Sequence, residues 1–73
     1  MNREYSTTAI GIRISEKRRS LGLTQEMLAE AANISAIYVS VLELGKKNMS
    51  AEILFDLAEA LNTSTDYLLG REK

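Results

Sequence analysis

The sequence predicts an all-α protein, a compact domain of five helices, and two patterns carry this prediction. Apolar residues recur at intervals of three and four positions along several stretches, and they never alternate at every second position. Serine or threonine precedes most of these stretches, glycine or asparagine follows them, and the 73 residues contain no proline. These are the signals of short capped helices, so we expect no sheet.

The first helix is expected over about residues 8–21, with its apolar positions on one face. These positions are Ile10, Ile14 and Leu21. Arg18 completes the same face, where an unpaired buried charge would be costly. We therefore expect Arg18 either to find an acidic partner within the domain or to point separately into solvent.

Residues 24–45 predict two short helices joined by a tight turn. Thr24 can cap the first of them, and Asn33 tolerates the left-handed conformation that ends it. Ser35 can cap the second helix, which Gly45 then ends. Only three residues separate the helices, which is the spacing of a helix-turn-helix. The inward-facing residues are expected to be Leu28, Ala29, Ala32, Ile34, Val39 and Leu42.

Two more helices are expected towards the C-terminus. Ser50 can cap a fourth helix, which Asn62 can end. Ser64 can cap a last short helix at residues 65–69, which Gly70 ends. The fourth helix carries an apolar stripe at i, i+3, i+4 and i+7, formed by Leu54, Leu57, Ala58 and Leu61.

The composition argues against an enzyme, a cofactor or a metal site. The chain has no histidine and no cysteine, so it lacks the commonest general base, the commonest metal ligands and the most reactive nucleophile. Carboxylate pairs at i, i+4 do occur, on helix faces that we expect to be exposed: Glu26 with Glu30, and Glu52 with Asp56. Without a long apolar run or a signal peptide, we expect a soluble, cytoplasmic protein with no membrane partner.

Charge is unevenly distributed along the chain, although the net charge is only −1. Basic residues gather on the first helix and just after the second helix of the motif: Arg13, Lys17, Arg18, Arg19, Lys46 and Lys47. Residues 50–70 carry four acidic residues and no basic one. A molecule with one basic side would be oriented by a phosphate backbone despite its balanced total. The alternative is a solvated surface of mixed charge.

Residues 24–45 resemble the helix-turn-helix of the lambda-repressor, Cro and XRE-like transcription regulators. The positions that match the family's pattern are Thr24-Gln25, Leu28-Ala29, Ile34-Ser35, Val39-Ser40, Leu42-Glu43 and Gly45. The similarity covers about residues 10–69, although Asn33 stands where glycine is usual and Met49 where proline is frequent. The resemblance implies a sequence-specific regulator, expected to be a repressor, that binds double-stranded DNA at an operator as a homodimer.

The resemblance also implies which residues meet DNA. The second helix of the motif would lie in the major groove, with base-facing residues Ala36, Ile37, Ser40 and Val41. Phosphate contacts are implied for Thr24, Gln25, Ser35, Tyr38, Lys46, Lys47 and Asn48. A helix N-terminus favours a phosphate, which supports Thr24 and Gln25 in this role. The alternative is that these two residues are a helix cap and its neighbour only.

The implied base-facing residues lack the side chains that read bases by paired hydrogen bonds. None of them is Arg, Lys, Asn or Gln. Ser40 alone among them can hydrogen-bond a base edge directly, and the others can contact thymine methyl groups. We therefore expect A·T-rich targets or reading by DNA shape, with affinity that depends on phosphates and falls steeply with salt.

Two structural contacts follow from the resemblance. An ion pair between Arg18 and Glu43 would join the first helix to the end of the second motif helix and fix its angle. Dimerisation would use the region around the last helix, where the candidates are Phe55, Thr65, Tyr67 and Leu69. The alternative for Tyr67 is ordinary capping of a small core.

A protein-binding module on the same fold, such as an antitoxin, is the alternative function. Seven of the nine residues from Ala36 to Leu44 are apolar, and only Val39 and Leu42 are clearly needed inside. Exposed apolar clusters often mark protein contacts.

The expected organisation is a flexible arm at 1–8, the DNA-binding domain at 9–70 and a tail at 71–73. Control would then come from concentration, dimerisation or a regulatory protein partner.

Overall fold

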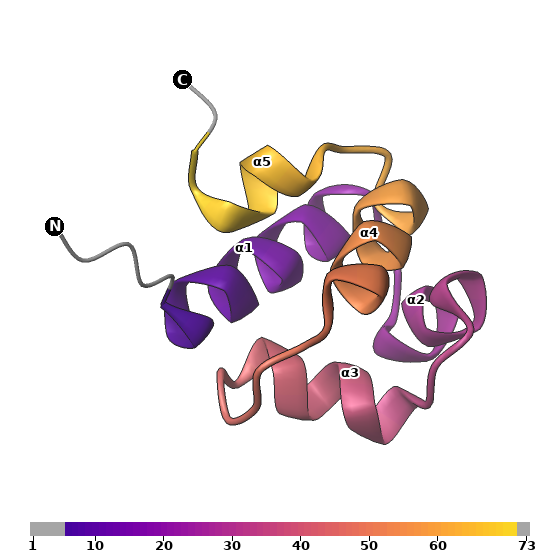
Figure 1. Cartoon of the computed structure of the whole chain (residues 1–73). Coiled ribbons are helices and arrows are strands. Elements are labelled where there is room, and N and C mark those ends of the chain that lie inside the picture. Colours follow the sequence, from indigo (N-terminus) through magenta and orange to yellow (C-terminus); the bar gives the residue numbers. More distant parts are fainter. Residues whose placement is uncertain (1–5, 72–73) are drawn as a thin grey trace, which may run out of the picture.

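The computed structural model describes residues 6–71, which form five α-helices and no strand (Figure 1). The helices are α1 (Thr7–Ser20), α2 (Gln25–Ala32), α3 (Ala36–Glu43), α4 (Ala51–Ala60) and α5 (Thr65–Leu69). In Figure 1, α1 lies between α5 on one side and α3 on the other, and it contacts both. The predicted all-α, five-helix fold is confirmed.

Side-chain caps explain where the helices begin. Each first turn starts at a residue whose hydroxyl accepts a hydrogen bond from the backbone N–H three positions later: Ser6, Thr24, Ser35, Ser50 and Ser64. Such a cap contributes about 1 kcal/mol to helix stability. The left-handed helix ends expected at Asn33, Asn62 and Gly70 have φ values of 60°, 55° and 79°.

The predicted N-terminal arm extends too far into the chain. Ser6 caps α1, so Thr7 and Thr8 are helical rather than part of an arm. Residues 1–5 of that arm and residues 72–73 of the tail lie outside the described residues.

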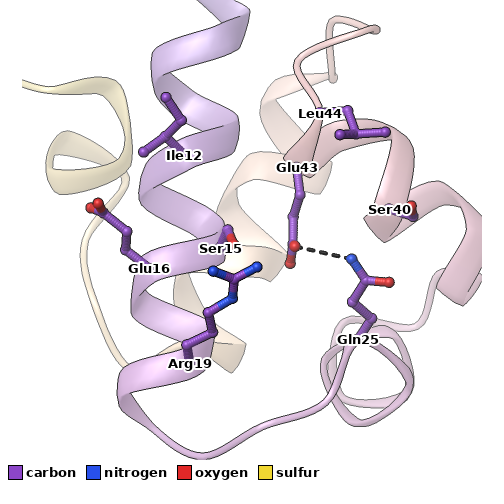
Figure 2. Close-up of a pocket in the computed structure, with 8 residues that line it drawn as sticks. All are labelled: Ile12, Ser15, Glu16, Arg19, Gln25, Ser40, Glu43 and Leu44. Carbon is purple, nitrogen blue, oxygen red and sulfur yellow. Dashed lines mark hydrogen bonds between the residues drawn. The ribbon is translucent and has the colours of Figure 1, made fainter.

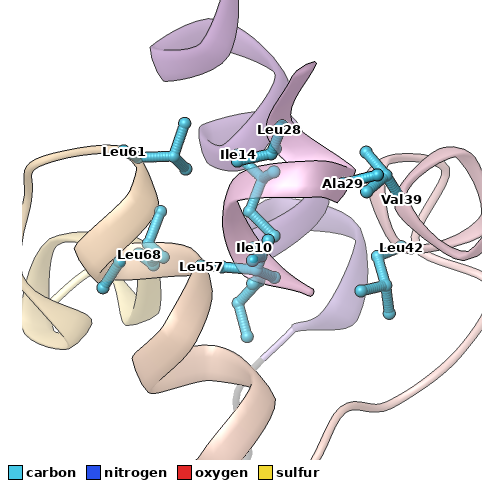
Figure 3. Close-up of a cluster of buried hydrophobic side chains, with 11 residues drawn as sticks. Ile10, Ile14, Leu28, Ala29, Val39, Leu42, Leu57, Leu61 and Leu68 are labelled. Carbon is cyan, nitrogen blue, oxygen red and sulfur yellow. The ribbon is translucent and has the colours of Figure 1, made fainter. Parts of the chain in front are cut away.

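The hydrophobic core lies where the five helices meet (Figure 3). Its buried apolar residues are Ile10, Ile14, Leu28, Ala29, Ala32, Val39, Leu42, Leu57, Ala58, Leu61 and Leu68. Three residues expected inside are less buried. Ile34 and Leu54 are only partly buried, and Leu21 is 44% exposed because α1 ends one residue before it. Leu23 packs against the core instead.

A close approach of backbones fixes α3 against the first half of α1. Gly11 is buried there, and a Cβ atom added to it would lie 2.6 Å from the carbonyl oxygen of Glu43 and closer still to that of Leu42. Thr7 reinforces the crossing, because its hydroxyl donates a 3.0 Å hydrogen bond to the carbonyl oxygen of Gly45. The C-terminal end of α3 and Gly45 after it are therefore held against α1 by the close approach at Gly11 and by the hydrogen bond from Thr7.

Candidate nucleic-acid interface

The outward face of α3 is the first part of the candidate interface. Val39 and Leu42 are each 1% exposed and turn the opposite face into the core. Ile37 is 78% exposed, and Ser40 and Val41 are partly buried beside it. At 100° per residue these three positions lie within one stripe on the side away from the core. The structure thus brings three of the four expected base-facing residues together, and the fourth, Ala36, is partly buried at the start of the helix.

The residues expected at phosphates lie at the start of α2, at the start of α3 and in the loop after α3. Thr24 is exposed and caps α2, because its hydroxyl accepts a 3.0 Å hydrogen bond from the Met27 N–H. Ser35 does the same for α3 through the Tyr38 N–H, and the Tyr38 side chain is partly buried against the core. The loop after α3 presents three exposed side chains: Lys46, Lys47 and Asn48.

An ion pair between Arg18 and Glu43 holds α3 against α1, at the position expected from the sequence. The pair is bidentate, with Nε to Oε2 at 2.6 Å and Nη2 to Oε1 at 3.0 Å. A third bond runs from Arg18 Nη1 to the Leu23 carbonyl oxygen at 2.9 Å. The two side chains are only 10% and 6% exposed. A planar guanidinium that makes three bonds in a fixed geometry sets the direction of α3, which is more than a loose charge contact would do.

Gln25 is a third member of this cluster, which sequence reasoning missed. Its Nε2 donates a 3.0 Å hydrogen bond to Glu43 Oε1 (Figure 2). From the sequence, Gln25 is expected to contact a phosphate or, alternatively, to have no role beyond that of a helix cap's neighbour. The amide nitrogen carries two hydrogens, so the bond to Glu43 leaves one for another acceptor. No local signal could have found this bond, because it joins residues 18 positions apart and depends on where α3 ends.

The ion pair also changes the ionisation of both partners. Burial raises the pKa of the Glu43 carboxyl, but hydrogen bonds from Arg18 and Gln25 and the positive charge of Arg18 outweigh it, and the net pKa lies below its usual value. The hydrogen bond to Glu43 raises the pKa of Arg18 above its usual value, against the opposing effect of burial. Both groups therefore stay charged at neutral pH.

A shallow groove of about 350 Å³ lies beside the ion pair, between α1, the start of α2 and the end of α3 (Figure 2). Its lining residues are Ile12, Ser15, Glu16, Arg19, Gln25, Ser40, Glu43 and Leu44. The groove is open to solvent and carries both charges, since Glu16 and Arg19 lie on the same wall. Within residues 6–71, no group of three or more carboxylates is arranged to hold a metal ion. In that same range, no helix is long and apolar enough to span a membrane.

The basic residues of α1 do not form one continuous basic side, which corrects the expectation from the sequence. Arg13 donates a 3.3 Å hydrogen bond to the carbonyl oxygen of Leu68 in α5. Lys17 lies over the ring of Tyr67, with its Nζ 5.7 Å from the ring centroid. Both therefore face α5, on the other side of α1 from α3 (Figure 1). Arg18 is buried in the ion pair, so the exposed cations near α3 are Arg19, Lys46 and Lys47.

The four residues expected at a dimer interface lie on α4 and α5. Phe55 is 56% exposed, while Thr65, Tyr67 and Leu69 are partly buried. Phe55 and Thr65 also line a hollow of about 280 Å³ between the two helices. Tyr67 and Leu69 pack against the edge of the core, so each has a structural contact within the chain as well.

The chain is similar in sequence and in fold to known proteins. The family described as "Helix-turn-helix" matches residues 14–68. The HTH-type transcriptional regulator ImmR of Bacillus subtilis (strain 168) is 35% identical over 65 residues, which is 89% of this chain and only about half (51%) of the length of ImmR.

Two solved structures share the fold. The restriction-modification controller protein C.AhdI from Aeromonas hydrophila is 34% identical, with a TM-score of 0.82 over 85% of this chain and 94% of that one. The P22 c2 repressor, solved in complex with a synthetic operator, is 32% identical, with a TM-score of 0.81 over 86% of this chain and 96% of that one. From the matched residues and the shared architecture, the chain belongs to the helix-turn-helix family of lambda-repressor, Cro and XRE-like transcription regulators.

Proposed function

We propose that the chain is a DNA-binding transcription regulator that represses by laying α3 in the major groove of an operator. The observation that carries the proposal is the outward stripe of α3, held at a fixed angle by the Arg18–Glu43 pair. A helix with its side chains is about 10–12 Å across, and the major groove is about 12 Å wide. An α3 fixed in this way fits the groove without rearrangement of the domain.

The flanks of α3 supply contacts with the DNA backbone in this proposal. The N-terminus of α2, with Thr24 and Gln25, meets a phosphate through backbone N–H groups and the remaining Gln25 amide hydrogen. Exposed Lys46 and Lys47, in the loop that follows α3, meet further phosphates together with Asn48. Ser35 and Tyr38 lie at the start of α3. In this proposal they face the DNA backbone. These contacts set position and affinity, and they do not specify sequence.

Two copies of the chain bind one operator in this proposal. The exposed ring of Phe55 and the edge of α5 form the contact, with Thr65, Tyr67 and Leu69 at its centre. A two-fold dimer places its two reading helices about 34 Å apart and asks for a roughly palindromic operator. Sedimentation equilibrium with and without operator DNA tests this step. A monomer on DNA would contradict it.

A protein-binding role is the second candidate, because Ile37 and Leu44 are 78% and 61% exposed on a helix that is apolar nearly throughout. In that case α3 would cover a partner protein such as a toxin. The proposed regulator is not an enzyme and needs no cofactor. It acts where the DNA is, which in a bacterial cell is the cytoplasm.

A salt titration of binding to random-sequence duplex DNA separates the two candidates. A DNA-binding regulator retards the duplex at low salt, and log Kd changes linearly with log salt concentration. Replacing Lys46 and Lys47 by alanine lowers that slope by about 1.8 per protomer, since each phosphate contact contributes about 0.9. The control removes one exposed cation beyond the end of α5, Arg71→Ala, and leaves the slope unchanged. No retardation at any salt concentration would leave the protein-binding role.

A further inference from the structure

We infer that α3 selects its operator by the C5-methyl groups of pyrimidines, so that methyl contact rather than base hydrogen bonding decides sequence preference. This inference rests on the proposed function and goes beyond it, because it names the chemical group that is read. It starts from the outward stripe of α3, whose exposed side chain at the helix's first turn is Ile37, at 78%. Val41 follows one turn later, and Ser40 lies beside both.

Most polar side chains of residues 36–44 make contacts within the domain, which leaves few of them to hydrogen-bond a base. This supports the inference. From residue 36 to residue 44 the side chains that can form hydrogen bonds are those of Ser40, Glu43 and, through its hydroxyl, Tyr38. Glu43 accepts bonds from Arg18 and Gln25, and its side chain is only 6% exposed, so it is directed into the domain and away from a base edge. Tyr38 packs partly against the core. Ser40 remains, and a single hydroxyl accepts from or donates to several bases alike.

Phosphate-binding groups beside the stripe indicate DNA as the occupant rather than an apolar protein. The capped N-terminus of α2 lies beside the end of α3, where Gln25 bonds to Glu43, and the exposed Lys46 and Lys47 follow that end along the chain. An apolar strip next to a helix N-terminus and two exposed lysines matches a major groove, whose floor carries thymine methyl groups and whose walls are phosphates. An apolar protein surface would leave the two lysines without a complementary charge.

Three versions of one duplex test the inference. Selection from a random pool supplies an operator, in which thymines are then replaced by deoxyuridine within the base pairs that α3 covers. Deoxyuridine lacks only the methyl group, and burying one such carbon is worth about fourfold in Kd. We expect about fourfold weaker binding for each methyl group removed. A third duplex places 5-methylcytosine, paired with guanine, at those positions and should bind more tightly than its unmethylated cytosine counterpart by the same factor.

Side-chain substitution assigns the effect to Ile37. Ile37→Ala should reduce the difference between thymine and deoxyuridine to nearly nothing at one base pair, while Val41→Ala acts on a neighbouring one. The residue is so exposed that its truncation should leave the fold intact. Leu21→Ala, which trims an exposed leucine at the end of α1, is the matched control and should keep the full difference.

The outcomes separate this inference from the proposed function. Equal affinity for thymine and deoxyuridine duplexes, or a selected operator without thymine under α3, overturns the methyl readout and leaves a DNA-binding regulator. A fourfold difference that survives both Ile37→Ala and Val41→Ala also overturns it. Failure to retard any duplex, whatever its bases, overturns the proposed function itself.

Discussion

Arg13 and Arg18 lie five positions apart on α1, and each holds a different helix in place. Arg18 is 8% exposed and makes two bonds to Glu43 and one to the Leu23 carbonyl oxygen. Arg13 is partly buried and makes a 3.3 Å bond to a carbonyl oxygen at the end of α5. One arginine is committed to a charged partner inside the domain, and the other contacts a neutral oxygen at its edge.

The difference indicates which part of the molecule is rigid. Removing one partner of a buried ion pair leaves an uncompensated charge in a low dielectric, whereas removing the Arg13 contact leaves only a neutral carbonyl oxygen that has lost one hydrogen bond. The α1–α3 region, which carries the candidate interface, should therefore be fixed by the fold. The α1–α5 region should open more easily, because α5 has five residues and is held by Leu68, Arg13 and Lys17.

Arg18→Ala should have the largest effect on stability. It leaves Glu43 buried without its cation, and we expect a loss of about 3–5 kcal/mol in the free energy of unfolding. Urea denaturation followed by circular dichroism measures this loss. Arg13→Ala is the control on the same helix, and equal losses from the two substitutions would contradict the comparison. Arg18→Lys should not restore stability, since an ammonium cannot make the bidentate contact.

Gly11→Ala should come next, because it disturbs the same α1–α3 crossing from the backbone side. The added Cβ meets the carbonyl oxygens of Leu42 and Glu43, which cannot rotate away as a side chain could. We expect a loss of about 3 kcal/mol, the upper end of the range for overpacking, despite alanine's better helix propensity. Gly22→Ala is the matched control: nothing lies within 4 Å, and its cost comes from a φ of +73° alone. A Gly11→Ala protein as stable as wild type would show that the crossing can widen freely.

Local signals made much of the fold predictable from the sequence, while contacts between helices were not. Capping by Thr24 and Ser35 and the left-handed turn at Asn33 depend on neighbouring residues only, so the motif's boundaries could be inferred directly. The partner of Arg13 depends on which helix packs beside that face of α1. The partner of Gln25 depends on where α3 ends. At 100° per residue Arg13 lies about 140° from Arg18, so a different face was foreseeable, but the presence of α5 on that face was not.

Glu43→Gln should cost less than Gly11→Ala and should depend on pH. The folded Glu43 carboxyl has a pKa below its usual value, so the unfolded chain takes up the proton first as the pH falls. The stability that Glu43 contributes is thus present above about pH 5 and is lost as the pH falls through the folded pKa. At pH 7 we expect Glu43→Gln to be about 2 kcal/mol less stable than wild type, a smaller loss than that of Arg18→Ala, because the amide oxygen that replaces the carboxylate still accepts a bond from Arg18.

The pH series itself provides the test of the carboxylate's role. Chemical denaturation between pH 7 and pH 3 should show the gap between wild type and Glu43→Gln narrowing towards acid. A gap that stays constant over the series would mean that the carboxylate's charge does not stabilise α3. The Arg13 contact offers a contrast, because its acceptor is a carbonyl oxygen that does not titrate.

Arg13→Ala and Lys17→Ala should have the smallest effects, about 1 and about 0.5 kcal/mol, as expected for a long hydrogen bond and for a cation–π contact at the edge of the domain. These two substitutions test which part of the fold loses stability. Amide hydrogen exchange should become faster in α5 and stay unchanged in α3, because α5 can open without the rest of the domain. Faster exchange in both helices would mean that α5 and α3 open as one unit, and the contrast between the two sides of α1 would then be wrong.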